Sequence, residues 1–168
     1  MLLTFDDGFR DFAEYAWPLL KRHGFSATVF LVADQIGKTN AWDHAFGEEV
    51  ELMDWQEILR LQEEGVEFGS HTVSHAPLTG LSPADVVREC VRSRVMLEEK
   101  LKRPVDAIAY PYGDQDAAVR HLAGACGYTY GLTCRSARCR FEDSLLGLSR
   151  IEVPGGITLP EFVLSLGT

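Results

Sequence analysis

The sequence of 168 residues contains no uninterrupted apolar stretch long enough to cross a membrane, which would need about 20 residues. It also does not open with a charged segment followed by an apolar one, so we see no secretory signal peptide and expect a cytoplasmic protein. Met1 leads directly into residues that resemble a protein core. Whether an upstream segment has been lost is left open by the sequence.

Basic residues are scarce as well. There are 16 Lys and Arg against 25 Asp and Glu, which gives a formal net charge of −9. Residues 41–67 hold nine of the acids and a single base, Arg60. Because no basic stripe is available to neutralise phosphates, we do not expect a nucleic-acid partner. We interpret the acidic run as a solvated helix face with its adjoining loop.

Cysteines number four, too few for a disulfide scaffold in a chain of this size. Cys90 and Cys126 have apolar neighbours and are expected to be small core residues. Cys134 and Cys139 lack the second ligand pair of a structural zinc site, so we expect reduced thiols in a surface loop. A Gly-x-Ser-x-Gly elbow is also missing, which leaves hydrolysis by a serine nucleophile without support.

What the chain does contain is an alternation of apolar and amphipathic stretches. Strands are expected at residues 1–5, 27–32, 66–70, 105–110, 128–133 and 146–153. Helices are expected at 9–23 with a kink or a restart at Pro18, at 53–64, 82–104 and 115–125, and from residue 158. The pattern predicts a single α/β domain with mostly parallel strands. Since a full (β/α) barrel usually needs about 250 residues, we expect a distorted or incomplete barrel.

Two of the expected helices have an apolar face that predicts which residues point inward. These are Met53, Ile58, Leu59 and Leu61 in the first, and Val87, Cys90, Val91, Leu97 and Leu101 in the second.

Two adjacent carboxylates, Asp6 and Asp7, end the first expected strand, and Gly8 follows them. Adjacent acids repel each other unless a cation or a proton lies between them. A plain turn is the alternative, because Asp and Gly are common turn residues.

Two histidines, His71 and His75, follow the third expected strand, and Tyr112 follows the fourth. The carboxyl ends of parallel strands meet on one face, so these groups and the Asp pair are expected to converge. An extended chain would hold the histidines about 13 Å apart, but a turn would bring them to roughly 6 Å. We therefore expect a turn, in which the hydroxyls of Ser70 and Thr72 orient the rings. Two unrelated loop histidines are the alternative.

Two imidazoles and one carboxylate form a three-ligand site with open positions, which is typical of a catalytic metal. We expect one divalent ion, with zinc first and cobalt, nickel or iron also compatible with these ligands. Such an ion activates water and polarises a carbonyl group. One Asp can then be a ligand while the other acts as the base.

Three stretches of the sequence resemble, in order and spacing, motifs of the polysaccharide deacetylases (carbohydrate esterase family four, the NodB-type homology domain): residues 4–8 (TFDDG), 71–75 (HTVSH) and 110–113 (YPYG). The resemblance implies a distorted (β/α) barrel, with residues 1–168 as the catalytic domain. It also implies a hydrolase of non-peptide carbon–nitrogen bonds, which removes N-acetyl groups (O-acetyl groups in some members) from an amino-sugar glycan or sugar intermediate. By motif position, Asp6 would be the general base, and Asp7, His71 and His75 the metal ligands. Tyr112 would offer its backbone N–H to the oxyanion hole.

The sequence departs from the family pattern at two places. Ala109 stands where many members have an Arg that pairs with the base, and the late Leu-x-His motif with its general acid is absent from residues 148–153 (LSRIEV). Arg150 in this stretch is a poor proton donor, since the pKa of arginine exceeds about 12. We predict that Arg150 is instead the partner of Asp6. The general acid is then either Asp6 itself or His44, although an ordinary loop histidine is the preferred interpretation of His44.

Other residues and other functions remain open at this stage. Residues 37–43 are similar to a segment of deacetylases linked to bacterial glycan synthesis. Trp42 of this chain lies in that stretch and is either a wall on which a sugar stacks or a packed loop residue. His23 and His121 lie in expected helices and are interpreted as structural. A metal-dependent amidohydrolase acting on a small cyclic amide or ureide is the second hypothesis. A non-catalytic carbohydrate-binding domain is the third, but it would not need Asp6. The oligomeric state is left open.

Overall fold

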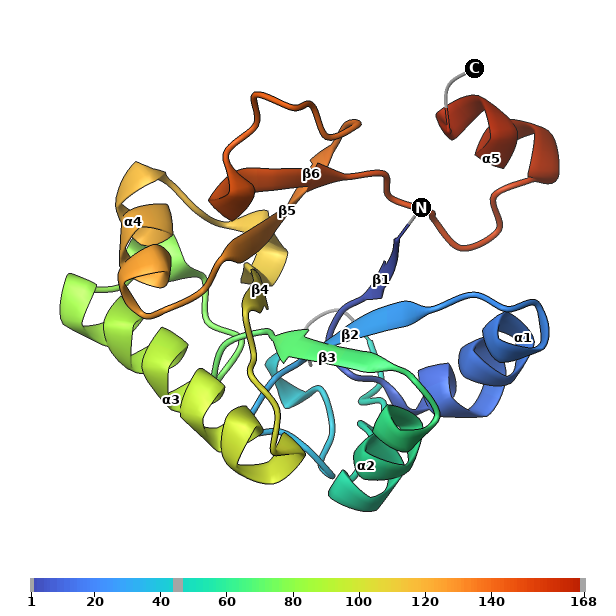
Figure 1. Cartoon of the computed structure of the whole chain (residues 1–168), viewed down its shortest axis with the longest axis horizontal. Helices are drawn as coiled ribbons and strands as arrows, with labels where there is room; N and C mark the ends of the chain where they lie inside the picture. The colour runs from blue at the N-terminus through green and yellow to red at the C-terminus, as the bar shows by residue number, and fades with distance from the viewer. Residues whose placement is uncertain (1, 44–46, 167–168) are drawn as a thin grey trace.

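Six parallel strands form one curled sheet whose strand order follows the chain, from β1 to β6 (Figure 1). The computed structural model describes residues 2–43 and 47–166. The strands are β1 (Leu3–Phe5), β2 (Ala27–Leu31), β3 (Glu67–Ser70), β4 (Ala107–Ala109), β5 (Tyr130–Ser136) and β6 (Leu148–Arg150). The curl is open between β1 and β6, as expected for an incomplete barrel. Several strands are shorter than predicted, because the chain leaves the sheet early to build the loops at its ends.

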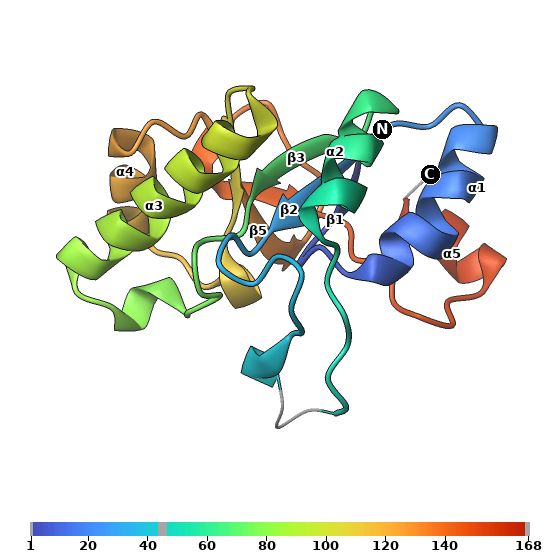
Figure 2. The ribbon, with the colours of Figure 1, turned by 90° about the horizontal axis from the view of Figure 1, so that it is seen from below.

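Helices cover the outer face of the curl (Figures 1 and 2). They are α1 (Trp17–Arg22), α2 (Trp55–Glu63), α3 (Pro83–Leu101), α4 (Ala117–Ala125) and α5 (Leu159–Ser165). The helices α2, α3 and α4 each begin after an N-cap residue whose side chain accepts a bond from a backbone N–H of the first turn. These residues are Asp54, Ser82 and Asp116. Among the residues described, no helix is both long and apolar enough to span a membrane.

Of the two alternatives predicted at Pro18, a kink or a restart of the helix, the structure shows the restart. A π-helical turn, Phe12–Ala16, runs directly into α1, with Pro18 in the first turn of that helix. Pro18 has no N–H for the helical ladder, and wide turns of this kind are typical where the ladder is interrupted.

The hydrophobic core lies between the sheet and α2 and α3. All of β2 is buried, and Ile58, Leu61 and Leu97 are fully enclosed. Two predictions were wrong, since Leu59 and Val91 are each 39% exposed. The inward stripe of α3 passes through Val86 and Ser93, with Val87 only partly buried. A hydrophobic pattern does not reveal which face of α3 points inward, because the buried residue Ser93 is polar. Its hydroxyl bonds to that of Ser70 (Oγ–Oγ 2.7 Å).

All four cysteines are free thiols. Cys90 is buried and Cys126 partly buried, close to the prediction. Cys139 is exposed in the loop after β5, whereas Cys134 is exposed within β5 itself. The loop prediction for Cys134 was wrong because β5 continues to Ser136, where it pairs with Arg150 of β6.

Candidate metal centre and catalytic site

The predicted site residues meet at the carboxyl ends of the strands. Asp6 and Asp7 follow β1, His71 follows β3, Tyr112 lies in the 3₁₀ turn after β4 (Pro111–Gly113), and Arg150 ends β6. The loop between β2 and α2 reaches away from the sheet (Figure 2) and then returns beside the first motif. Its end is fastened there by backbone bonds from Met53 N to Gly8 O (2.9 Å) and from Arg10 N to Glu51 O (3.0 Å).

Asp7, His71 and His75 bring three ligand atoms within 4.8 Å of one another. Oδ1 of Asp7 lies 3.5 Å from Nε2 of His71 and 3.2 Å from Nε2 of His75. Two ligands bonded to one tetrahedral zinc ion would be separated by about 3.3 Å. Oδ1 of Asp7 is buried without a hydrogen-bond partner among the described residues. This orphaned carboxylate oxygen facing two imidazole nitrogens fits a divalent metal ion.

The ring of His71 is oriented by a backbone carbonyl. Nδ1 of His71 lies 2.7 Å from the oxygen of Ala109, so it carries the proton and leaves the Nε2 lone pair facing Asp7. Burial lowers the pKa of His71, which favours the neutral ring that a metal needs. The prediction that Ser70 and Thr72 orient the rings was wrong. Their hydroxyls accept bonds from the backbone N–H groups of Thr72 and His75 (both 3.2 Å), because the turn has no regular ladder to satisfy them.

The second histidine is enclosed by aromatic rings. Trp42 stacks on His75 with centroids 4.7 Å apart and planes at 29°, and the ring of Tyr112 meets His75 edge-on at 4.6 Å. The structure thus contains a packing contact of Trp42, whose ring stays partly exposed, and the sugar-stacking interpretation stays a prediction. Tyr112 itself is 52% exposed and has a positive φ of 58°.

Asp6 is paired with Arg150. Nη1 and Nη2 of Arg150 donate to Oδ1 and Oδ2 of Asp6, each at 2.7 Å. The same guanidinium donates to Thr133 O (3.0 Å) and to Thr4 Oγ1 (3.3 Å), so it spans the open edge between β6 and β1. Burial by itself would raise the pKa of Asp6, but the bonds from Arg150 and the nearby positive charges lower it below its usual value. The two adjacent acids thus have different surroundings.

Among the described residues, two further histidines, His23 and His121, do not join this cluster. His44 lies outside the described residues, so its proposed acid role stays a prediction. His23 caps the end of α1 and His121 lies on α4, both exposed. Sequence reasoning missed Trp42 as a packing partner of His75, and also Glu89 of α3, which bonds to the histidine turn. The stretch of residues 37–43 drew attention to Trp42 but did not indicate His75 as its partner, and no motif marks Glu89.

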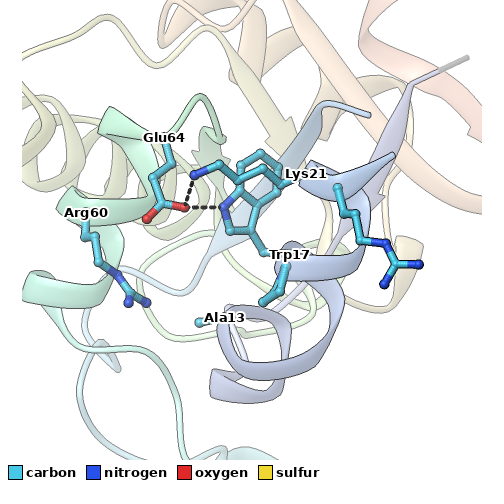
Figure 3. A pocket seen from close by; sticks show the side chains of 7 residues that line it. Ala13, Trp17, Lys21, Arg60 and Glu64 are labelled. Carbon is cyan, nitrogen blue, oxygen red and sulfur yellow. Dashed lines mark hydrogen bonds and ion pairs between the residues drawn. The ribbon is translucent and has the colours of Figure 1, made fainter. Parts of the chain in front are cut away.

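The described residues form surface cavities, of which two bear on the site assignment. One of about 320 Å³ adjoins the site and is lined by residues such as Asn40, Asp43, Glu48 and Tyr112. The other, of about 410 Å³, lies between α1 and α2 (Figure 3). There Glu64 accepts bonds from Trp17 Nε1 (2.7 Å) and Lys21 Nζ (3.1 Å). None of the predicted site residues lines this second cavity, so we interpret it as a structural junction of two helices.

Sequence comparisons agree with this geometry. A family model described as "Polysaccharide deacetylase" matches residues 1–131. The YxkH protein of Bacillus subtilis is 28% identical over 94% of this chain and 53% of its own length. A Staphylococcus aureus protein named poly-beta-1,6-N-acetyl-D-glucosamine N-deacetylase is 24% identical over 78% of this chain and 46% of its own length. The chain thus spans about half the length of the curated relatives it matches.

Solved structures share the fold over nearly the whole chain. The Streptococcus pyogenes deacetylase PplD, solved with acetate, has a TM-score of 0.85 and 26% identity over 99% of this chain and 70% of its own. IcaB from Ammonifex degensii also has a TM-score of 0.85, with 22% identity over 99% of this chain and 72% of its own. With the family match over most of its length, the chain belongs to the polysaccharide deacetylase family.

Proposed function

We propose that the chain is a metal-dependent hydrolase that removes N-acetyl groups, or O-acetyl groups, from an amino-sugar glycan or sugar intermediate. The observation that carries the proposal is the cluster of Asp7, His71 and His75 beside the paired Asp6 and Arg150. The name of the Staphylococcus aureus relative makes a polymer of N-acetylglucosamine the first substrate to test. Residues 1–168 would form one catalytic domain, and its cytoplasmic location stays a prediction.

Asp7, His71 and His75 would hold the divalent ion, with zinc as the first candidate. When bound, such an ion supplies Lewis acidity towards the amide carbonyl and towards water. The hydrogen bond from His71 to Ala109 keeps the ligand ring in a fixed orientation.

Asp6 would be the general base. The bidentate contact with Arg150 keeps its carboxylate ionised and oriented. As water attacks the amide carbon, Asp6 takes one of its protons. When the carbon–nitrogen bond breaks, protonated Asp6 passes that proton to the leaving nitrogen, which gives acetate and a free amine. The backbone N–H of Tyr112 would donate to the carbonyl oxygen as negative charge develops on it.

Acetate release tests this function. Zinc-loaded protein is incubated with oligomers of N-acetylglucosamine, and separately with a cyclic ureide, beside metal-stripped protein. Acetate formed only by the loaded protein on the oligomer supports the proposal. Opening of the cyclic ureide without acetate from the sugar favours the amidohydrolase hypothesis. Oligomer binding without turnover of either substrate favours the binding-domain hypothesis.

A further inference from the structure

The turn that carries the two histidines has an unfavourable backbone. Thr72 and His75 have φ values of 67° and 63°, a region that residues with a side chain rarely occupy. Such conformations persist only where the surrounding structure holds them in place. The turn from residue 71 to 75 therefore needs a source of support outside itself.

The backbone N–H groups of the turn show where this support comes from. His71 N donates to Leu31 O of the neighbouring strand (2.8 Å). Thr72 N and His75 N use hydroxyls of the turn segment itself, those of Ser70 and Thr72. The two N–H groups in the middle, from Val73 and Ser74, both donate to Oε2 of Glu89, at 2.8 and 2.9 Å. One side chain from another element thus satisfies both N–H groups at the centre of the turn, while the carbonyls of Thr72 and Val73 accept bonds from Ala33 N (3.0 Å) and Asp34 N (3.1 Å).

Glu89 lies in the second turn of α3, and its second oxygen is used as well. Oε1 of Glu89 accepts a bond from Ser74 Oγ at 2.9 Å. Bonds to an ionised carboxylate are stronger than those between neutral groups. One helical turn further on, Ser93 bonds to Ser70 at the end of β3 (2.7 Å). Residues 89 and 93 share a face of the helix, so α3 holds both the strand end and the turn that follows it.

We propose that Glu89 is a positioning residue for the metal centre. It does not touch the ligand atoms. By holding the centre of the turn, it keeps the His75 ring at the distance from Asp7 and His71 that one ion requires. This inference rests on the proposed function, because it needs Asp7, His71 and His75 to bind a metal.

Zinc affinity, measured by competition with a chromophoric chelator, tests the role. Glu89→Met keeps the helix and the side-chain length but removes both acceptors, and we expect zinc binding to weaken by about tenfold or more. Glu89→Gln keeps one oxygen for the two N–H groups and can donate to Ser74, so it should recover most of the affinity. Glu99→Met changes an exposed glutamate of the same helix and should leave affinity unchanged.

Amide hydrogen exchange in the metal-free protein gives a second readout. Val73 and Ser74 should lose protection in Glu89→Met and keep it in Glu99→Met. If Glu89→Met does not fold, Ser74→Ala removes one of the three bonds and leaves α3 intact. Zinc binding weakened by about twofold or more is then expected.

The results separate this inference from the proposed function. Zinc bound by the wild type and equally well by Glu89→Met, or by Ser74→Ala in its place, would overturn the role of Glu89 alone. A wild type that binds no zinc would overturn the metal centre and the role of Glu89 with it.

Discussion

The part of the chain up to the third motif (residues 2–113) and the part from β5 onwards (residues 130–166) contribute differently to the molecule. The first, here the ligand region, holds Asp7, His71 and His75 and most of the buried core. The second, here the C-terminal region, ends in α5, whose described residues are all exposed or only partly buried (Figure 1). Yet it provides Arg150, beyond the residues that the family model matches.

The two adjacent acids thus have partners from different parts of the fold. Asp7 faces two histidines that follow a strand of the packed sheet, whereas Asp6 is paired with an arginine that reaches across the open edge between β6 and β1. Variants can therefore perturb the proposed metal site and the proposed base separately.

The largest effect is expected from Asp6→Asn. The amide cannot accept the proton from water, so kcat for acetate release should fall by about 100-fold or more. Zinc binding should persist, because the ligand region keeps its three donors. Turnover assays beside zinc titration check this, and full activity in the variant would exclude Asp6 as the base.

Arg150→Met removes the contribution of the C-terminal region to the site. We expect activity at neutral pH to fall by about 10- to 100-fold, since the carboxylate loses its orientation. Arg135→Met, which changes an exposed arginine of β5, should have little effect.

The pH–rate profile tests the pairing of Arg150 with Asp6 in a second way. Asp6 must be ionised to act as the base, so activity rises as the pH passes its pKa. Burial raises this pKa and Arg150 lowers it. Arg150→Met removes the hydrogen bonds and the charge of Arg150 and leaves the lowering effects of His71 and His75 in place, so the pKa of Asp6 should rise and the acidic limb of the profile should move to higher pH. An unmoved limb in Arg150→Met would contradict the pairing as the cause of the lowered pKa.

The two regions should also differ in stability. Leu97 is fully buried in α3, and Leu97→Ala should lower the free energy of unfolding by about 2–5 kcal/mol. Leu164 in α5 is 72% exposed, so Leu164→Ala should change it by only about 0.5 kcal/mol or less. Denaturant unfolding measures both, and equal losses would show that α5 is as well packed as α3.

The smallest effect concerns Glu64 at the junction of α1 and α2. The bond from Trp17 and the bond from Lys21 hold the pKa of Glu64 below its usual value. A lowered pKa adds stability above the pKa of the unfolded chain, and this stability is lost as the pH falls through the folded pKa. Glu64→Gln should therefore lower Tm slightly at neutral pH, with the difference from wild type vanishing in acid. A difference independent of pH would exclude the charge as its source.

Sequence reasoning predicted the elements that have a strong local signal. The alternation of strands and helices gave the curled parallel sheet, and three motifs at strand ends gave the convergence of Asp7, His71 and His75. The partnership of Arg150 with Asp6 followed from a missing arginine at Ala109, and the structure contains this contact. In these cases the spacing along the chain carries the spatial information.

The failures come from contacts that no local pattern encodes. The hydrophobic pattern of α3 predicts that Val91 points inward, but Ser93 is the buried residue. Ser93 can be buried because it bonds to Ser70, which lies on another element. The Ala109 carbonyl orients His71, and a carbonyl is available at every residue. Glu89 is one of many acids in the chain, and only the fold shows that it faces the histidine turn.

The most direct test of the central claim is the amount of zinc bound per chain, measured beside a His75→Ala variant. The arrangement of Asp7, His71 and His75 predicts about one equivalent in the wild type and its loss in the variant. Absence of bound zinc in the wild type, or an unchanged equivalent in His75→Ala, would contradict a metal centre at these three residues.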